Sequence, residues 1–180
     1  TNMNKFETFE LHNKEILIAG FGRIGKNLIK KCLGFDMVVK VYDPFVDEKV
    51  ITDMGGQKVD NFDIALETLD FLSVHMPLNE KTKDLINFKK MKTMKKSSVI
   101  INTARGGIVN ETDLNQAINE NIILGAGLDV FSNEPINVDN PLLKNKRIIL
   151  SPHTAALTNE CKIRMGKETA SNIIDFFEKK

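Results

Sequence analysis

The sequence predicts a doubly wound α/β domain, in which a parallel sheet carries helices on both faces. Two patterns support this fold class. Short apolar runs alternate with amphipathic stretches along nearly the whole chain. The runs are continuously apolar, as expected of parallel strands that are covered on both faces. At 180 residues, the chain has the length of one domain with a normal hydrophobic core.

The first half of the chain is predicted to form, in order, a strand, a helix, a strand, a helix and a strand. The predicted strands are the apolar runs EILIAG, MVVKVYD and FLSVHMP, at residues 15–20, 37–43 and 71–77. Between them lie GKNLIKKCLGF and NFDIALETL, residues 25–35 and 61–69, whose apolar positions recur at helical spacing. This order predicts strands that run in parallel and are joined by helices.

The second half continues the same alternation. Asn110 is expected to cap a helix, because acidic residues then occupy the first turn, where the positive helix end favours them. A long helical pattern closes the chain. In order, the predicted elements are helix 88–95, strand 97–104, helix 111–121, strand 122–131, strand 147–153 and a helix from 158 to about 179.

The composition argues against several classes of protein. The chain has 25 Lys plus Arg and 24 Asp plus Glu, so it lacks the positive field of a nucleic-acid-binding protein. Cys32 and Cys161 lie far apart without the neighbours of a metal site, and they suit a reducing compartment. No apolar run approaches the ~20 residues of a membrane-spanning helix. We therefore expect a cytoplasmic protein with no bound metal and no membrane or nucleic-acid partner.

A glycine-rich turn, GFGRIG, joins the first predicted strand to the first predicted helix. Gly20 permits a tight turn, Gly22 lets the backbone approach a pyrophosphate, and Gly25 lets the helix pack closely on the strand. The helix N-terminus then offers free amides to the phosphates. Asp43 ends the next strand, where a carboxylate can bind an adenosine ribose, although it could simply start the turn DPF. The pattern predicts a Rossmann-type domain that prefers NAD to NADP, because Asp43 would repel a 2′-phosphate.

Later strand ends carry polar groups of different kinds. Arg105 follows one strand, Asp129 and Glu134 follow the next, and His153 follows the last. Because parallel strands end at the same edge of a sheet, these groups are expected to converge there. Such a set suits the oxidation of a 2-hydroxy acid, in which arginine grips the carboxylate and histidine takes the hydroxyl proton. We expect Glu134 and His153 within hydrogen-bonding distance, so that the acid fixes the imidazole tautomer.

Each of these groups also has a purely structural interpretation. Arg105 could form a surface salt bridge, Glu134 could be a turn residue, and His153 could be a satisfied structural histidine. His75 is expected to shape the cofactor wall rather than to move protons.

Six motifs carry a resemblance that spans nearly the whole chain. In order they are GFGRIG, YDP, HMPLNEKT, INTARGGIVNETDL, GAGLDVFSNEP and SPHTAALT. Together they resemble the D-isomer-specific 2-hydroxyacid dehydrogenases, especially the phosphoglycerate dehydrogenase-like branch. The resemblance implies an NAD-dependent oxidoreductase that acts on a CH–OH group, with 3-phosphoglycerate or a close relative as substrate. Transcriptional corepressors share the fold and its Arg, Glu and His, so an NAD-sensing interaction protein is a second hypothesis.

The resemblance also implies roles for single residues. Arg105 corresponds to the arginine that binds the substrate carboxylate and carbonyl, Glu134 to the partner acid, and His153 to the proton donor and acceptor. Asp129 corresponds to the residue that contacts the nicotinamide amide. A formate-oxidising branch usually carries glutamine at the position of Glu134, which argues against that branch. The implied cofactor contacts are Gly20, Gly22, Arg23, Ile24, Gly25, Asp43, His75, Met76, Pro77, Thr103, Ala104, Arg105, Asp129, His153 and Ala156.

The resemblance divides the chain into an NAD-binding domain, residues 1–157, and a C-terminal helix, residues 158–180. By this resemblance, about a hundred further residues, which precede the glycine loop in the family and form most of the substrate domain, are expected outside this chain. The last helix is expected to pack toward that domain as well as on this one. Part of its apolar stripe should therefore be exposed, or covered by a second copy in a homodimer. The stripe consists of Ile163, Ala170, Ile173, Ile174 and Phe177.

Overall fold

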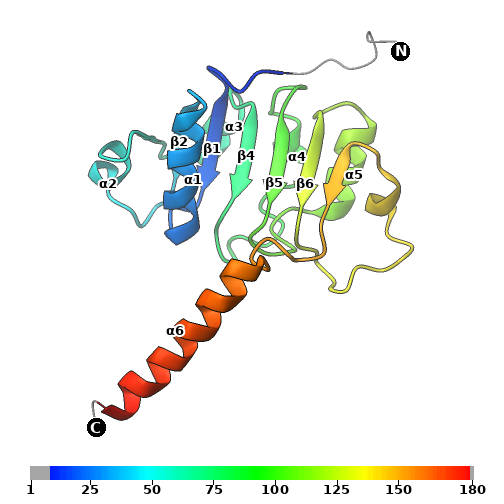
Figure 1. The fold of residues 1–180 in the computed structure, drawn as a ribbon. Helices are drawn as coiled ribbons and strands as arrows, with labels where there is room; N and C mark the ends of the chain where they lie inside the picture. The colour runs from blue at the N-terminus through cyan, green and yellow to red at the C-terminus, as the bar shows by residue number, and fades with distance from the viewer. Residues whose placement is uncertain (1–8, 179–180) are drawn as a thin grey trace, which may run out of the picture.

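The computed structural model describes residues 9–178, and its centre is a parallel sheet of seven strands (Figure 1). The order across the sheet is β3-β2-β1-β4-β5-β6-β7, and every neighbouring pair is parallel. The predicted fold class is confirmed. The strands are β1 Glu15–Ala19, β2 Val38–Tyr42, β3 Gln57–Lys58, β4 Phe71–Val74, β5 Val99–Asn102, β6 Gly125–Leu128 and β7 Ile148–Leu150.

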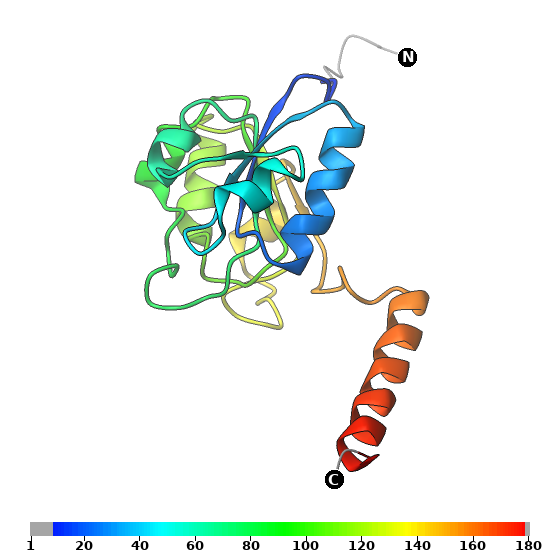
Figure 2. The ribbon, with the colours of Figure 1, turned by 90° about the vertical axis from the view of Figure 1, so that its left-hand side faces the viewer.

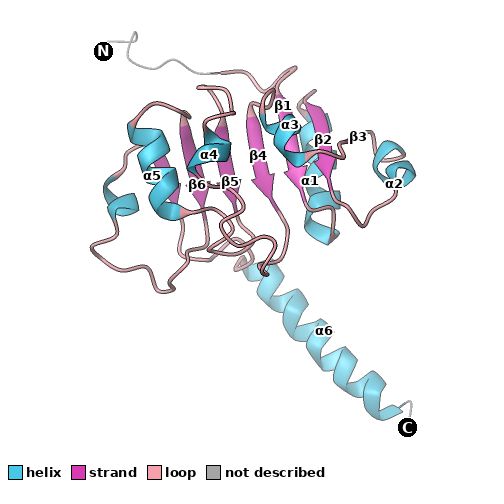
Figure 3. Ribbon diagram, turned by 180° about the vertical axis from the view of Figure 1, so that it is seen from behind, coloured by secondary structure: helices cyan, strands magenta, loops and turns pink. Residues whose placement is uncertain are grey.

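Helices cover both faces of the sheet. The first helix, α1, lies on one face, whereas α3, α4 and α5 lie on the other, which faces the viewer in Figure 3. Asn110 caps α5 as predicted, because its side chain accepts a hydrogen bond from the Asp113 amide at 3.0 Å. The helices are α1 Arg23–Gly34, α2 Glu48–Thr52, α3 Phe62–Leu66, α4 Phe88–Met91, α5 Glu111–Asn119, the 3₁₀ helix η2 Pro141–Lys144 and α6 Asn159–Glu178.

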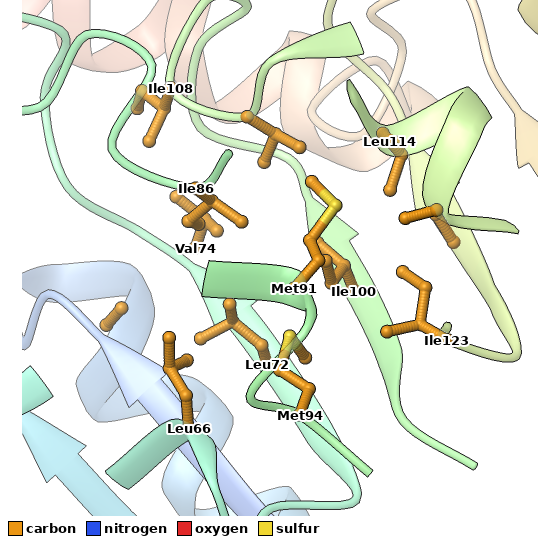
Figure 4. Close-up of a cluster of buried hydrophobic side chains, with 14 of the residues drawn as sticks. Leu66, Leu72, Val74, Ile86, Met91, Met94, Ile100, Ile108, Leu114 and Ile123 are labelled. Carbon is orange, nitrogen blue, oxygen red and sulfur yellow. The ribbon is translucent and has the colours of Figure 1, made fainter. Parts of the chain in front are cut away.

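The core explains why the strands are continuously apolar. In β1, Ile16 and Ile18 belong to the cluster that packs under α1, whereas Leu17 and Ala19 belong to the cluster on the opposite face. Figure 4 shows this second and larger cluster, which lies between the sheet and α3, α4 and α5. Burial of each large apolar side chain contributes about 1.5–3 kcal/mol, so the two clusters hold the sheet between its helices.

Three short elements were not predicted from the sequence: α2, β3 and η2. Each is five residues or fewer, too short to show a clear period in its side chains. The predicted strand 122–131 begins only at Gly125, because Ile122 still bonds back to α5 through its amide. The predicted helix 88–95 is helical only to Met91 and ends in turns.

The C-terminal helix α6 extends away from the sheet (Figures 1 and 2). The expected exposure of its apolar stripe is confirmed, with Ile163 59% and Phe177 69% exposed. The expectation that the helix also packs on this domain is wrong for this structure, since none of its residues is buried. The physical reason is the loop 151–158, which leaves the sheet edge and directs the helix outward.

Candidate cofactor and catalytic site

The strand register brings the predicted site residues to one edge of the sheet. Ala19, Val74, Asn102, Leu128 and Leu150 are the last residues of five neighbouring strands, and each is in register with the next. The chain therefore enters five loops at the same level, and these loops hold most of the predicted residues. The strand order reverses between β1 and β4, the place where open α/β sheets bind ligands.

The glycine loop after β1 is shaped by close backbone contacts. Gly20 has φ +100°, and a Cβ there would lie 2.6 Å from the His75 carbonyl oxygen. A Cβ at Gly25 would lie 2.4 Å from the Gly20 carbonyl oxygen. At Gly22, in contrast, a Cβ would meet nothing within 4 Å. Gly20 thus permits the turn and Gly25 the close helix packing, whereas Gly22 leaves open space at the start of α1.

Asp43, directly after β2, holds the glycine loop from the side. Its two carboxylate oxygens accept hydrogen bonds from the Phe21 amide at 2.8 Å and from the Phe45 amide at 2.9 Å. The second contact is the turn that the sequence suggested as an alternative role. The first contact shows that Asp43 also binds the glycine loop itself, and the ribose-binding role of Asp43 stays a prediction.

A pocket of about 590 Å³ lies beside this loop. His75 lies in its wall, with Nε2 2.8 Å from the Ser73 hydroxyl oxygen. Burial lowers the pKa of the His75 imidazole, which favours the neutral ring at physiological pH. Its buried Nδ1 has no hydrogen-bond partner among residues 9–178. The pocket is lined by Ile24, His75, Met76, Pro77, Leu78, Thr103, Ala104 and Arg105.

These features fit a dinucleotide. The N-terminus of α1 has no side-chain cap at Gly22 and no acidic residue in its first turn, so its amides and positive dipole end can receive a phosphate. The open space at Gly22 leaves room for a pyrophosphate, and the unpaired Nδ1 of His75 offers a polar contact. Gly22 with Arg23 would hold the phosphates, and Asp43 the adenosine ribose.

Glu134 and His153 form a hydrogen-bonded pair at the same sheet edge. His153 Nδ1 lies 2.7 Å from Glu134 Oε2, so the expected contact is confirmed. The other carboxylate oxygen of Glu134 accepts the Phe131 amide at 3.0 Å. The hydrogen bond with His153, followed by that from Phe131, holds the pKa of the Glu134 carboxyl below its ordinary value. Glu134 is therefore ionised at neutral pH and fixes the Nδ1 side of the imidazole.

A buried carboxylate organises the loop that carries His153. Asp129 is only 3% exposed and accepts hydrogen bonds from the Ser151 hydroxyl at 2.6 Å and from the amides of Thr154 at 2.8 Å and Ala155 at 2.9 Å. Burial opposes ionisation, but these bonds outweigh it and lower the pKa of Asp129. His153 itself has φ +54°, a conformation that costs free energy for a residue with a Cβ. The bonds to Asp129 on both sides of His153 stabilise that conformation.

Some of the predicted residues line two separate pockets, and the others lie outside both. Glu134 and His153 line a second pocket of about 280 Å³, together with Phe131, Pro135, Ile136 and Pro152. Arg105 lines the first pocket, where its Nη1 donates to the Ala104 carbonyl oxygen at 2.6 Å. Asp129 lies buried beneath the His153 loop, and Ala156 is exposed beyond it. The predicted residues outside both linings are Gly20, Gly22, Arg23, Gly25, Asp43, Asp129 and Ala156.

Some contributors to this edge were missed from the sequence. Leu78 lines the first pocket, and the motif HMPLNEKT, which contains it, was the available signal. Gly106 packs against the Phe131 backbone, and Ser151 bonds to Asp129. Their roles depend on contacts between loops that are distant in sequence. In the described residues, no cluster of three or more His, Cys, Asp or Glu is arranged to hold a metal ion.

The fold and the glycine loop define a dinucleotide-binding domain of the Rossmann type. The family described as D-isomer specific 2-hydroxyacid dehydrogenase, NAD binding domain, matches residues 1–155. The chain belongs to this family, and its cofactor is NAD. No helix in residues 9–178 has the length and apolar character that are needed to cross a membrane.

Curated relatives include both reductases and dehydrogenases. A glyoxylate reductase of Korarchaeum cryptofilum is 37% identical over 168 residues, 93% of this chain and 50% of that protein. A D-3-phosphoglycerate dehydrogenase of Methanocaldococcus jannaschii is 37% identical over 169 residues, 94% of this chain and 32% of that protein. This chain thus spans about a third to a half of the length of these relatives.

Solved structures agree with this assignment. A glyoxylate reductase of a Paecilomyces species matches with a TM-score of 0.80 and 32% identity, over 88% of this chain and 47% of that one. The NAD-complexed D-isomer specific 2-hydroxyacid dehydrogenase of Lactobacillus delbrueckii matches with a TM-score of 0.85 and 25% identity, over 99% of this chain and 57% of that one.

Proposed function

We propose that this chain is the NAD-binding half of a D-2-hydroxyacid dehydrogenase, which interconverts a 2-hydroxy acid and a 2-oxo acid. The observation that carries the proposal is the contact between His153 Nδ1 and Glu134 Oε2 at 2.7 Å, in the second pocket, at the same edge of the sheet as the cofactor pocket. An ionised carboxylate that holds one nitrogen of an imidazole is the arrangement that proton transfer by histidine requires.

The side chains would divide the reaction as follows. Bound NAD supplies the acceptor for the hydride that leaves the substrate carbon. Glu134 accepts a hydrogen bond from Nδ1–H of the neutral imidazole, which leaves the Nε2 lone pair of His153 free to take the hydroxyl proton. The carboxylate of Glu134 then stabilises the imidazolium ion that forms. Arg105 would bind the substrate carboxylate through two parallel hydrogen bonds.

The substrate is held, on this proposal, between this domain and a second one. Phosphoglycerate or a close relative is our preferred substrate, since the motifs favour that branch, and a D-3-phosphoglycerate dehydrogenase is among the relatives. In our division of the chain, the C-terminal segment 158–180 contains α6, and the exposed apolar stripe of α6 supports docking on the other half of the protein. The unpaired cysteines favour a cytoplasmic location, and the balanced charge argues against nucleic acid as a partner. The exposed stripe of α6 would also accept a second copy of the chain in a homodimer, and the lack of a long apolar run argues against a membrane partner.

Turnover by the complete protein tests this proposal. We expect the complete protein to reduce at least one 2-oxo acid with NADH, in a panel that contains glyoxylate, hydroxypyruvate and 3-phosphohydroxypyruvate. The 180-residue chain should bind NADH but turn over these acids poorly, because positioning and exclusion of water supply much of the rate. Absence of turnover across the panel would favour the NAD-sensing alternative, and equal turnover by both proteins would refute the two-domain substrate site.

Cofactor preference gives a second test. We expect NADH to bind the 180-residue chain at least about tenfold more tightly than NADPH, a difference of about 1.4 kcal/mol, because Asp43 repels a 2′-phosphate. Asp43→Asn should narrow that gap, as measured by fluorescence titration with both cofactors. Asp47→Asn is the matched control, since Asp47 is exposed and its side chain caps nothing. Equal affinities in the unchanged chain would show that Asp43 does not select the cofactor.

A further inference from the structure

We propose that Glu111 is a positioning residue, which fixes the loop that carries Glu134 and thereby fixes where the Glu134 carboxylate meets His153. The proposal rests on the proposed function of the Glu134–His153 pair. Glu111 is one of the acidic residues in the first turn of α5, for which the sequence indicated only a favourable effect on the start of the helix. Its contacts in the structure go beyond that helix.

The loop in question, residues 132–140, has little packing of its own and is called the Glu134 loop here. Only Ile136 and Asn140 are half-buried, and the other seven residues are exposed. Buried side chains flank the loop on both sides, Phe131 before it and Leu142 in η2 after it. An exposed loop with so few apolar contacts depends on hydrogen bonds for its shape.

Glu111 supplies such bonds at both ends of the Glu134 loop. The Ser132 amide donates to Glu111 Oε1, and the side-chain nitrogen of Asn140 donates to Glu111 Oε2 at 3.4 Å. Asn140 in turn caps η2, because its Oδ1 accepts the Leu142 amide at 2.9 Å. One half-buried carboxylate therefore joins the first and the last residue of the loop to the start of α5.

The contact with Ser132 lies two residues before Glu134. The backbone from Ser132 to Glu134 sets the position of the Glu134 carboxylate. One of its oxygens accepts the Phe131 amide at 3.0 Å, and the other lies 2.7 Å from His153 Nδ1. Bonds to a carboxylate are among the stronger hydrogen bonds in proteins. Loss of the Glu111 carboxylate would free the first turn of the loop and increase the distance between Glu134 and His153 in part of the population.

A second acid on α5 provides a matched control. Asp113 lies two positions further along the same first turn and accepts the Phe88 amide of α4 at 2.8 Å. Both acids are half-buried and both accept a backbone amide from a distant segment. Only Glu111 contacts the Glu134 loop, so the two substitutions separate positioning of that loop from general stability.

The test compares Glu111→Ala, Glu111→Gln and Asp113→Ala by ¹³C NMR titration of the Glu134 carboxyl in the 180-residue chain. We expect the Glu134 pKa to rise toward its ordinary value in Glu111→Ala, because the bond with His153 that lowers it is weakened. Glu111→Gln keeps an acceptor for the Ser132 amide and should restore most of the effect. Asp113→Ala should leave the Glu134 pKa unchanged even where urea unfolding shows a loss of stability.

In the complete enzyme, Glu111→Ala should lower kcat by about tenfold to 10²-fold without weakening NADH binding, because a displaced Glu134 no longer orients the imidazole of His153. An unchanged Glu134 pKa in Glu111→Ala, or an equal shift in Asp113→Ala, would overturn the proposal. The titration needs no substrate, so it tests positioning independently of the reaction. Absence of turnover by the unmodified complete enzyme would instead overturn the proposed function.

Discussion

Replacing His153 by alanine in the complete enzyme is expected to lower kcat by about 10²- to 10⁴-fold, the contribution of general acid–base catalysis by histidine. Its imidazole is held at Nδ1 by Glu134 at 2.7 Å and lies on a loop that Asp129 fixes through three hydrogen bonds. Alanine keeps the loop bonds, which come from neighbouring residues, and removes only the group that exchanges the proton. Steady-state kinetics with NADH and the best 2-oxo acid would measure the loss.

Cofactor binding separates this effect from a general disturbance of the site. NADH affinity of the 180-residue chain should change less than about threefold in His153→Ala, since the glycine loop and the first pocket are untouched. The matched control is His12→Ala. The His12 side chain is 60% exposed, its Nδ1 lies 3.7 Å from Asp36 Oδ2, and His12 is distant in sequence from the residues of the site. A kcat for His153→Ala within tenfold of the unmodified enzyme would exclude His153 as the main proton carrier.

The largest effect on stability is expected from Gly106→Ala, which should lower the free energy of unfolding by at least about 3 kcal/mol. A Cβ at Gly106 would lie 1.9 Å from both the carbonyl carbon and the carbonyl oxygen of Phe131. These are backbone atoms of a residue that is only 7% exposed, so they cannot rotate aside. The loop with Arg105 and the segment before Glu134 would have to separate. Urea unfolding of the 180-residue chain, followed by circular dichroism, measures the change.

A helical glycine at which an added Cβ would contact no other atom provides the comparison. At Gly34, the last residue of α1, an added Cβ meets nothing within 4 Å. Gly34→Ala should change the free energy of unfolding by no more than about 1 kcal/mol, and in the stabilising direction. An unfolding free energy of Gly106→Ala within about 0.5 kcal/mol of the unmodified chain would show that the two loops do not approach as closely as described.

The sequence predicted those parts of the site that follow from strand ends. Gly20 and His153 each come shortly after an apolar run, and parallel strands that are in register bring such positions to one edge. The pairing of Glu134 with His153 was predictable for the same reason, because their strands, β6 and β7, are neighbours. A local pattern and one rule of sheet topology were sufficient for these residues.

Contacts between loops could not be predicted in this way. Glu111 contacts residues 21 and 29 positions away, and Asp129 bonds to residues between 22 and 26 positions away. The approach of Gly106 to Phe131 is likewise set by how two loops pack. No period or turn signal marks such pairs, because either partner alone suits a solvated surface. The left-handed backbone of His153 was hidden for the same reason.

The exposure of α6 has a consequence for how the chain opens. A helix of 20 residues without a buried side chain lacks the tertiary packing that supplies most of the stability of helices in proteins, and it is stabilised by little beyond its own hydrogen bonds. The strands of the sheet can exchange their amide protons only when the core around Leu72 and Ile100 opens. The molecule therefore contains two cooperative units with different opening free energies, and the weaker unit begins only six residues after His153.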